Sequence, residues 1–322
     1  MTDPLLHARD ISKHYGGIDA LKGVSLEVHP GEVVALMGEN GAGKSTMAKI
    51  IAGVEQRDSG VIEWRGQETH FRDTRDATAA GIAIVLQELS LVPDLSVAEN
   101  VFLAHRTAYR GGWWLDRAAV NQGTRDLAAG LGWDFPLDPE RKVSDLTVAE
   151  QQMVEILRAL SLDAQLVILD EPTATLSPHE VEVLFSLVRR LQARGTAFLM
   201  VTHRLEEVFA LSDRITVYRD GALSGTFVTA ETNQAEVIRA MVGRDLGDIF
   251  TIRQRQTPGE AVLDVQGLTL SRDGAPASFQ VRRGEIVGIA GLVGAGRTEL
   301  VRAIFGADRA AQGHVTLNGT AG

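Results

Sequence analysis

The sequence predicts a mixed α/β fold built on a parallel sheet, present once in full and a second time in part. Continuous apolar runs at 33–37 (VVALM) and 166–170 (LVILD) are typical of strands buried on both faces, as in a parallel sheet. A glycine-rich turn follows the first run, and two carboxylates, Asp170 and Glu171, lie at the end of the second. A block of glycines also recurs late in the chain at one fixed spacing, which indicates that the fold is repeated.

Composition limits the kind of protein this can be. The 322 residues suffice for one large domain or two ordinary ones, and the absence of cysteine excludes disulfides and thiolate chemistry. A formal net charge of -10 weighs against a nucleic-acid partner, which usually needs a basic face. No apolar run approaches the roughly 20 residues that span a bilayer, and the N-terminal MTDPLLHARD has no signal-peptide pattern. We therefore expect a soluble chain that meets a membrane only through another protein.

The repeat sets the predicted domain boundaries. Each glycine of the first block is matched 253 positions later, in the pairs Gly31/Gly284, Gly38/Gly291, Gly43/Gly296, Gly53/Gly306 and Gly60/Gly313. We expect a first domain over 1–243, a polar linker over 244–260 and the beginning of a second copy over 261–322. A first copy of roughly 245 residues needs its whole length to bury its sheet, so the second copy cannot be a complete domain.

The segment GENGAGKST, residues 38–46, carries the strongest chemical signal in the chain. It has the spacing glycine, four residues, Gly-Lys-Ser that forms a phosphate-binding loop between a strand and a helix. Its glycines let backbone N–H groups approach phosphates, and the helix N-terminus adds a positive dipole. Lys44 reaches the terminal phosphates and Ser45 can ligate magnesium. The alternative is a glycine turn that only caps a helix. The predicted nucleotide contacts are Gly38, Glu39, Asn40, Gly41, Ala42, Gly43, Lys44, Ser45 and Thr46.

Two carboxylates, Asp170 and Glu171, end the apolar run at 166–170. Ligands of parallel sheets bind beyond the carboxyl ends of the strands, where these side chains would lie. We expect Asp170 to hold magnesium through water and Glu171 to orient and deprotonate an attacking water. Asp-Glu at a strand end is common by itself, and it is the presence of Lys44 in the same chain that favours the catalytic interpretation.

Three further features complete an ordered set. Gln87 follows the apolar run IAIVL, the segment SDLTVAEQQMVEI at 144–156 precedes the carboxylates, and His203 follows AFLMV at 197–201. This order resembles the ATP-binding subunits of ABC transporters over essentially the whole chain. The resemblance implies an α/β P-loop NTPase fold of ABC type, with a parallel-sheet core, an N-terminal antiparallel β subdomain and a helical subdomain that carries the signature.

The resemblance also implies roles for single residues. Gln87 would touch magnesium and sense the membrane partner, while His203 would contact the γ-phosphate and hold the catalytic geometry. Tyr15 would stack on adenine, the alternative being a half-buried aromatic of a hairpin. ATP and Mg²⁺ are the implied cofactors. The implied catalytic residues are Glu171, His203, Lys44 and Gln87, and the implied metal-binding residues are Ser45, Gln87 and Asp170.

The family signature, normally Leu-Ser-Gly-Gly-Gln, is altered to Leu146, Thr147, Val148, Ala149, Glu150, and is followed by Gln151. Thr147 with Glu150 three residues later predicts a capping box at a helix start. Met153, Ile156, Leu157 and Leu160 then form one apolar face. Because Glu150 brings a negative charge where a phosphate should arrive, we expect either a weak phosphate clamp or only a helix cap.

The second copy carries a damaged loop, GIAGLVGAGRTEL at 288–300. An apolar run that indicates a strand precedes it, and its characteristic residues are Gly291, Gly294, Gly296, Arg297 and Thr298. Arg297 stands where lysine is expected, and its planar fork is bulkier than an ammonium group. In the family two domains pair head to tail, so this loop would face the altered signature, and the Lys44 site would face a signature beyond Gly322. Ser177, in place of the family's aspartate, would weaken communication between the sites.

One working and one degenerate site is the pattern of ribose, galactose and xylose importers, and the segments LTVAEQQMVEILRAL, VPDLSVAENVFLA and GLVGAGRTEL resemble that class. The resemblance implies an ATPase at the cytoplasmic face of the inner or plasma membrane. Its partners would be transmembrane sugar permease subunits, an extracytoplasmic sugar-binding protein and a second nucleotide-binding domain, with no nucleic acid. The alternatives are a nucleoside importer, a soluble twin-domain ATPase acting on ribosomes or DNA, and a non-catalytic remnant.

Overall fold

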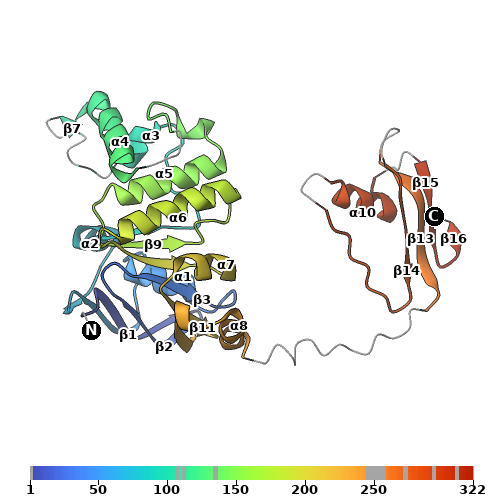
Figure 1. The fold of residues 1–322 in the computed structure, drawn as a ribbon, viewed down its shortest axis with the longest axis horizontal. Helices are drawn as coiled ribbons and strands as arrows, with labels where there is room; N and C mark the ends of the chain where they lie inside the picture. Colours follow the sequence, from blue (N-terminus) through green and yellow to red (C-terminus); the bar gives the residue numbers. More distant parts are fainter. Residues whose placement is uncertain are drawn as a thin grey trace. The chain divides into compact units, whose positions relative to one another are not determined.

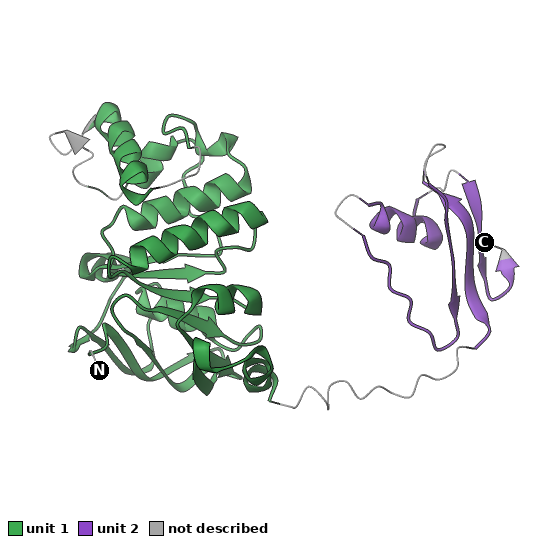
Figure 2. Cartoon of the chain, viewed as in Figure 1, with its two compact units in different colours: residues 1–246 green, residues 247–322 purple. Residues whose placement is uncertain are grey.

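The computed structural model of the chain describes residues 3–103, 105, 109–110, 114–132, 137–243, 259–270, 275–291, 295–308 and 312–321. The chain forms two compact units, residues 1–246 and 247–322, coloured separately in Figure 2. Most of the expected linker, residues 244–258, lies outside the described residues.

A six-stranded sheet forms the centre of the first unit (Figure 1). Its order is β12-β11-β3-β10-β9-β6, and every pairing is parallel except that of β11 with β12. All residues of β3, β9 and β10 are buried, as their continuous apolar sequences predict. The predicted parallel sheet is confirmed. The strands are β3 (Val33–Met37), β6 (Ile82–Val85), β9 (Leu166–Asp170), β10 (Ala197–Val201), β11 (Arg214–Arg219) and β12 (Ala222–Val228).

The two faces of this sheet pack against different layers. Alternate residues of β3 belong to different apolar clusters, because successive side chains of a strand point to opposite faces. Val33, Ala35 and Met37 pack with α5 (Val148–Leu160), α6 (Pro178–Gln192) and α7 (Leu205–Leu211). Val34 and Leu36 pack with α1 (Lys44–Ile51) and an antiparallel sheet. The remaining elements around the sheet are α2 (Thr74–Ala80), η3 (Thr229–Glu231) and α8 (Gln234–Val242).

The antiparallel sheet confirms the expected N-terminal β subdomain. Its order is β2-β1-β4-β5, from β1 (Leu6–Tyr15), β2 (Ile18–Val28), β4 (Ser59–Trp64) and β5 (Gln67–Thr69). The β1 pairing is irregular near Asp10, whose φ of 52° is held by a hydrogen bond from its N–H to Ser25 Oγ.

The expected helical subdomain lies between β6 and β9 in sequence. It contains α3 (Val97–Val101), β7 (Tyr109–Arg110), β8 (Trp114–Leu115), α4 (Arg117–Leu131), η2 (Val143–Asp145) and α5 (Val148–Leu160). Figure 1 shows α3 and α4 stacked beyond α5 on the side away from β1. None of the helices in the described parts of the chain combines the length and apolar character needed to cross a membrane.

The second unit repeats the antiparallel sheet and the helix after the loop. Its strands have the order β14-β13-β15-β16, which matches β2-β1-β4-β5, and α10 (Arg297–Phe305) begins 253 residues after α1. Even single hydrogen bonds recur. Ser278 Oγ accepts from Gly267 N–H as Ser25 Oγ does from Asp10, and Glu285 accepts from Arg282 N–H as Glu32 does from His29. The strands are β13 (Ala261–Thr269), β14 (Ala277–Arg282), β15 (Gln312–Leu317) and β16 (Thr320–Ala321).

The strand predicted before Gly291 is wrong for this chain. Residues 285–290 have no regular secondary structure, and Ile286 is 98% exposed. The equivalent strand of the first unit, β3, is held between β10 and β11, which come more than 150 residues later. Among the described residues of the second unit, the sheet consists of β14, β13, β15 and β16, and none of these strands pairs with residues 285–290. Apolar sequence alone cannot form a strand without neighbours to accept its hydrogen bonds.

Candidate active site

The loop of residues 38–43 joins β3 to α1 in the place predicted for a phosphate-binding loop. Its glycines are required by geometry, since Gly38 and Gly43 have φ values of 152° and 94°. A Cβ on Gly38 would lie 2.2 Å from the Tyr218 carbonyl oxygen, and one on Gly43 would lie 2.4 Å from that of Ala20. The loop is therefore pressed against β2 and β11, which leaves its backbone conformation little freedom.

Lys44 opens α1 and folds back over this loop. Its side chain is only 6% exposed, and Nζ donates hydrogen bonds of 3.0 Å to the carbonyl oxygens of Gly38 and Glu39. Burial lowers the pKa of Lys44, while the neighbouring carboxylates Glu171 and Asp170 oppose that shift. The ammonium thus stands beside both predicted carboxylates, where its charge can be shared with an incoming polyphosphate.

Ser45 and Asp170, predicted as magnesium ligands, contact each other. Ser45 Oγ donates to Asp170 Oδ1 over 3.1 Å, although 125 residues separate them in sequence. Burial raises the pKa of Asp170, and the hydrogen bond from Ser45 opposes the rise. Hydroxyl and carboxylate oxygens suit Mg²⁺, which is commonly held by one or two carboxylates together with substrate phosphates and water. Within the described residues there is no group of three or more His, Asp or Glu side chains placed to bind a metal alone.

Glu171 lies at the meeting point of three strand ends. Its carboxylate accepts from Gln87 Nε2 at 3.4 Å, after β6, and contacts His203 Nδ1 at 3.0 Å, after β10. Its backbone has a φ of 49°, and its N–H donates to the Val201 carbonyl oxygen over 2.9 Å. A non-glycine residue in this left-handed region is uncommon, and such strain often accompanies functional sites. The three residues predicted to act together are therefore in contact.

Tyr15 lies at the end of β1, on the hairpin to β2, and is 42% exposed. Burial and the nearby Glu55 carboxylate raise its pKa, while Lys13 and Thr46, the latter in the first turn of α1, oppose the rise. Lys13 Nζ is 5.2 Å from the ring centroid. The ring thus combines the half-buried hairpin position with a place beside the phosphate loop, and both interpretations of Tyr15 are compatible with it.

The altered signature forms the start of α5, and its predicted capping box is confirmed. Glu150 N–H donates to Thr147 Oγ1 at 3.2 Å, and Thr147 N–H donates to Glu150 Oε2 at 2.7 Å. Gln151 Nε2 donates to the Leu146 carbonyl oxygen, and the side chain of Val148 is exposed. In the described part of the chain no hydrogen bond or ion pair joins this segment to Lys44 or Glu171.

Arg141 is a residue that the sequence pattern did not reveal. Its Nη1 donates to Glu150 Oε1 over 2.7 Å. The Thr147 N–H and the Arg141 guanidinium hold the pKa of Glu150 below its ordinary value. Glu150 therefore stays ionised, and its charge is largely balanced within this subdomain. The pair involves residues nine positions apart around a 3₁₀ turn, so no helical or strand periodicity predicts it.

Two other predicted departures have a definite place in the structure. Ser177 is the N-cap of α6 and forms a capping box with Glu180, which explains a serine at that position. Arg297 begins α10, and its side-chain Cδ would lie 3.5 Å from a Cβ placed on Gly291. Thr298 is exposed in the first turn of α10, Gly296 has a φ of 78°, and Gly294 lies outside the described residues.

Comparison with known proteins gives consistent relatives. The family model described as ABC transporter matches residues 21–174 and 275–321. The chain is 46% identical over 317 residues to the ribose import ATP-binding protein RbsA 3 of Rubrobacter xylanophilus. It is 48% identical over 316 residues to the ribose import ATP-binding protein RbsA 2 of Streptomyces avermitilis. Each match covers 98% of this chain, but the chain spans only 63% and 62% of the lengths of these relatives.

Solved structures share the fold of the larger part of the chain. An ATP-binding cassette of an ABC transporter in its ADP conformation has a TM-score of 0.65 at 24% identity, over 76% of this chain and 100% of that one. A dimeric cassette in a post-hydrolysis state, bound to ADP and Pi, has a TM-score of 0.62 at 26% identity, over 70% of this chain and 98% of that one.

Proposed function

Since the chain belongs to the ABC transporter family, we propose that it is an ATP-hydrolysing subunit that energises the import of a monosaccharide of the ribose, galactose and xylose class. The observation that carries the ATPase assignment is the contact of Glu171 with both Gln87 and His203, beside a phosphate loop closed by Lys44. The printed names of the relatives, ribose import ATP-binding proteins, support the sugar class.

The proposed reaction is in-line attack of water on the γ-phosphate of ATP. The loop N–H groups and Lys44 hold the phosphates, and Glu171 orients the water and accepts its proton. His203 contacts the same carboxylate and would keep Glu171 in place. It would also contact the γ-phosphate of bound ATP. Mg²⁺, which Ser45, Asp170 and Gln87 would hold, neutralises developing charge when bound. Tyr15 would stack on the adenine ring.

The organisation of the assembly is part of the proposal. Residues 1–243 would be a first nucleotide-binding domain, 244–260 a linker and 261–322 the N-terminal part of a second, degenerate one. The two domains would pair head to tail. The subunit would lie peripherally at the cytoplasmic face of the membrane, against the permease subunits. An extracytoplasmic sugar-binding protein would deliver the sugar to the permease. The family membership and the import proteins among the relatives support these partners.

Glu171→Gln tests the reaction. The amide cannot accept the proton of the attacking water, so ATP hydrolysis should fall about 100-fold or more, with nucleotide affinity preserved. Lys44→Ala should lose nucleotide binding itself, because the loop loses its ammonium. Binding of a fluorescent ATP analogue and phosphate release, both measured in the assembly with the permease, separate the two effects.

Glu182→Gln, an exposed change on α6, is the matched control and should behave as the parent protein does. Hydrolysis at the parent rate in Glu171→Gln would show that Glu171 is not the general base. Uptake of labelled ribose, galactose and xylose against labelled nucleosides, with and without Lys44→Ala, identifies the cargo class. Lys44-dependent uptake of nucleosides alone would overturn the sugar assignment.

A further inference from the structure

Glu207 is a carboxylate buried near the active-site loops that no sequence motif singled out. It lies in the first turn of α7 and is 7% exposed. An ionised carboxylate at such a site is costly unless its oxygens accept hydrogen bonds, so its partners define what it holds in place. The structure supplies those partners from two loops outside α7.

The Glu207 carboxylate accepts hydrogen bonds from side chains of two different loops. Oε1 accepts from Thr173 Oγ1 at 2.6 Å and from Arg204 Nη1 at 3.1 Å, and Oε2 accepts from Thr202 Oγ1 at 3.1 Å. Thr202 Oγ1 in turn accepts from the Arg204 N–H at 3.1 Å. Both threonines are 2% exposed, so their hydroxyls are also committed to this network.

These partners flank the two reacting side chains. Thr173 follows Glu171 by two residues in the loop after β9. Thr202 and Arg204 stand on either side of His203 in the loop after β10. One carboxylate therefore fixes the backbone on both sides of His203 and the segment just after Glu171. Among the described residues, the Glu171 N–H also donates to the carbonyl oxygen of Val201, the last residue of β10.

A local helix-capping role does not account for Glu207. Glu99, Glu150 and Glu180 occupy the same third position in α3, α5 and α6, and each accepts from the backbone N–H of its own N-cap residue. In α7 the N-cap is Arg204, whose side chain makes no capping bond, and Glu207 reaches the two threonines instead. The Glu207 side chain therefore makes tertiary contacts with the two loops instead of capping its own helix.

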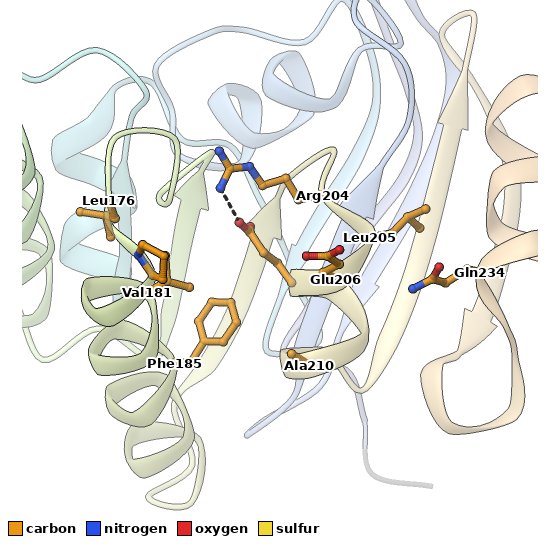
Figure 3. A pocket seen from close by; sticks show the side chains of 10 residues that line it. Leu176, Val181, Phe185, Arg204, Leu205, Glu206, Ala210 and Gln234 are labelled. Atoms are coloured by element: carbon orange, nitrogen blue, oxygen red, sulfur yellow. Dashed lines mark hydrogen bonds and ion pairs between the residues drawn. The ribbon is translucent and has the colours of Figure 1, made fainter. Parts of the chain in front are cut away.

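The network borders solvent on one side. A pocket of about 710 Å³ between α6 and α7 is lined by Arg204, Glu207, Leu205 and Phe185 among others. Figure 3 shows Arg204 among the residues that line this pocket, with a dashed line for its interaction. The partner in this ion pair is Glu207. Arg204 is partly exposed here, while the hydroxyl contacts of Glu207 lie in the interior. The threonine contacts are therefore the part of the network that a test should address.

We propose that Glu207 is a positioning residue, which sets the contact between the Glu171 carboxylate and the His203 ring by clamping the loops that carry them. For its effect on turnover the inference rests on the proposed ATPase function. The contact itself is a structural property that can be measured whether or not ATP is hydrolysed.

The first experiment follows the His203 ring by NMR in the isotope-labelled full chain, with the signal assigned by its loss in His203→Ala. Glu171→Gln defines the shift caused by changing the contact. Glu207→Gln should move the His203 signal in the same direction by at least half as much. The double variant Thr173→Val with Thr202→Val should do the same, and the corresponding Thr→Ser pair, which keeps both hydroxyls, should restore the parent signal.

The second experiment measures ATP turnover. Glu207→Gln and the Thr→Val pair should lower kcat about 10- to 100-fold, because small misplacements of catalytic groups carry costs of this order. Affinity for the ATP analogue should stay within about twofold of the parent value, because the phosphate loop is untouched. Glu32→Gln is the matched control, since Glu32 accepts from His29 N–H and Arg214 at the opposite, amino end of β3. It should lower stability without changing kcat or the His203 signal.

An unchanged His203 signal in both Glu207→Gln and the Thr→Val pair would overturn the inference. If Glu207→Gln does not fold, the Thr→Val pair decides alone. A parent protein that neither binds nor hydrolyses ATP would refute the proposed function, while the NMR comparison would still decide whether Glu207 positions His203.

Discussion

Gly43 shows how tightly a single backbone position is specified in this loop. Its φ of 94° is a conformation that side chains with a Cβ rarely adopt, and a Cβ there would meet the Ala20 carbonyl oxygen and the Leu21 side chain at 2.4 and 2.5 Å. Strain and collision therefore act at the same residue. Gly195 has almost the same φ, 95°, but a Cβ on it would meet no atom within 4 Å. The chain thus provides a pair in which the two effects can be separated.

We expect Gly195→Ala to lower the free energy of unfolding by about 1–2 kcal/mol, the cost of a left-handed alanine. Gly43→Ala should cost about 1–3 kcal/mol more, because atoms of β2 must also move. It should weaken ATP-analogue binding as well, since the loop cannot keep its shape. Urea unfolding and binding titrations of the two variants measure both effects. Equal losses of stability would mean that β2 yields easily and that the loop is not clamped.

At this scale the sequence predicted the residues that follow strands and missed those joined only by side chains. Lys44, Glu171 and His203 could be placed because each belongs to the segment that follows a buried apolar strand, and the ends of parallel strands converge. Arg141 and Glu207 could not be placed. Arg141 pairs with Glu150 nine residues away, and Glu207 accepts from Thr202 five residues away and from Thr173 34 residues away, at spacings set by loop paths rather than by helix or strand periodicity.

Among the secondary-structure elements, several helices have N-termini held by side-chain hydrogen bonds. The beginnings of α3, α5 and α6 have complete capping boxes, each a Ser or Thr N-cap with a Glu at the third helical position. In α5 the glutamate also pairs with Arg141 of the preceding loop. The element that replaces the family signature is therefore a well-capped helix start, with its negative charge already balanced.

The charge of Glu150 makes part of this stability dependent on pH. Its pKa in the folded state lies below the ordinary value of about 4.3, so its contribution is complete above that value and is lost as the pH falls through the lowered folded-state pKa. Glu150→Gln should reduce the free energy of unfolding by about 0.3–1 kcal/mol at pH 7, and the gap from the parent should close in acid. Thermal or urea unfolding of both proteins from neutral to acid pH measures the difference in their free energies of unfolding.

Glu182→Gln provides the comparison for this pH series, because that exposed residue of α6 lies outside the capping box formed by Ser177 and Glu180. A gap between parent and Glu150→Gln that stays constant from neutral to acid pH would refute a contribution from the ionised carboxylate.

Secondary structure was predicted correctly from the sequence where a capping residue and an apolar helix face agree, as in α5. It failed for residues 285–290, where a strand depends on partners distant in sequence.

Two copies of one supersecondary pattern, unequal in their chemistry, define the whole molecule. The two sheets have the same strand order, and equivalent hydrogen bonds occur within each of them. The loop lysine of the first copy, however, is Arg297 in the second. The stem of Arg297 lies near Gly291, whereas Lys44 Nζ is hydrogen-bonded within its loop. The framework is therefore duplicated, while the residue at the position of the loop lysine differs between the two copies.

Arg297→Ala should consequently leave ATP turnover within about twofold of the parent rate, since removing an interaction that does not stabilise the transition state leaves the rate unchanged. Lys44→Ala, its counterpart in the first copy, is the comparison and should abolish turnover. Both variants are to be assayed for phosphate release in the same assembly. A loss with Arg297→Ala comparable to that with Lys44→Ala would mean that the second loop takes part in hydrolysis.

The two units should also differ in their ability to fold alone. The first has two large apolar clusters, whereas the buried hydrophobic residues of the described second unit are Val265, Leu268 and Ala303. A fragment of residues 1–243 should unfold within about 2 °C of the main transition of the full chain, because the two units contribute independently. Residues 259–322 alone should show no cooperative transition. Calorimetry of both fragments checks this, and a sharp transition in the shorter one would contradict it.

The central strand β3 has a consequence in time as well as in space. It pairs with β10 and β11, and Ala197, the first residue of β10, follows Met37 by 160 residues. At the roughly 5–20 residues per second of protein synthesis, about 10–30 s pass between the translation of β3 and that of its first neighbour. Throughout that interval an apolar, β-branched segment has no strand beside it, which is the condition under which nascent chains aggregate or recruit chaperones. The strand order that brings Lys44, Glu171 and His203 together thus also determines how long β3 remains unpaired during translation.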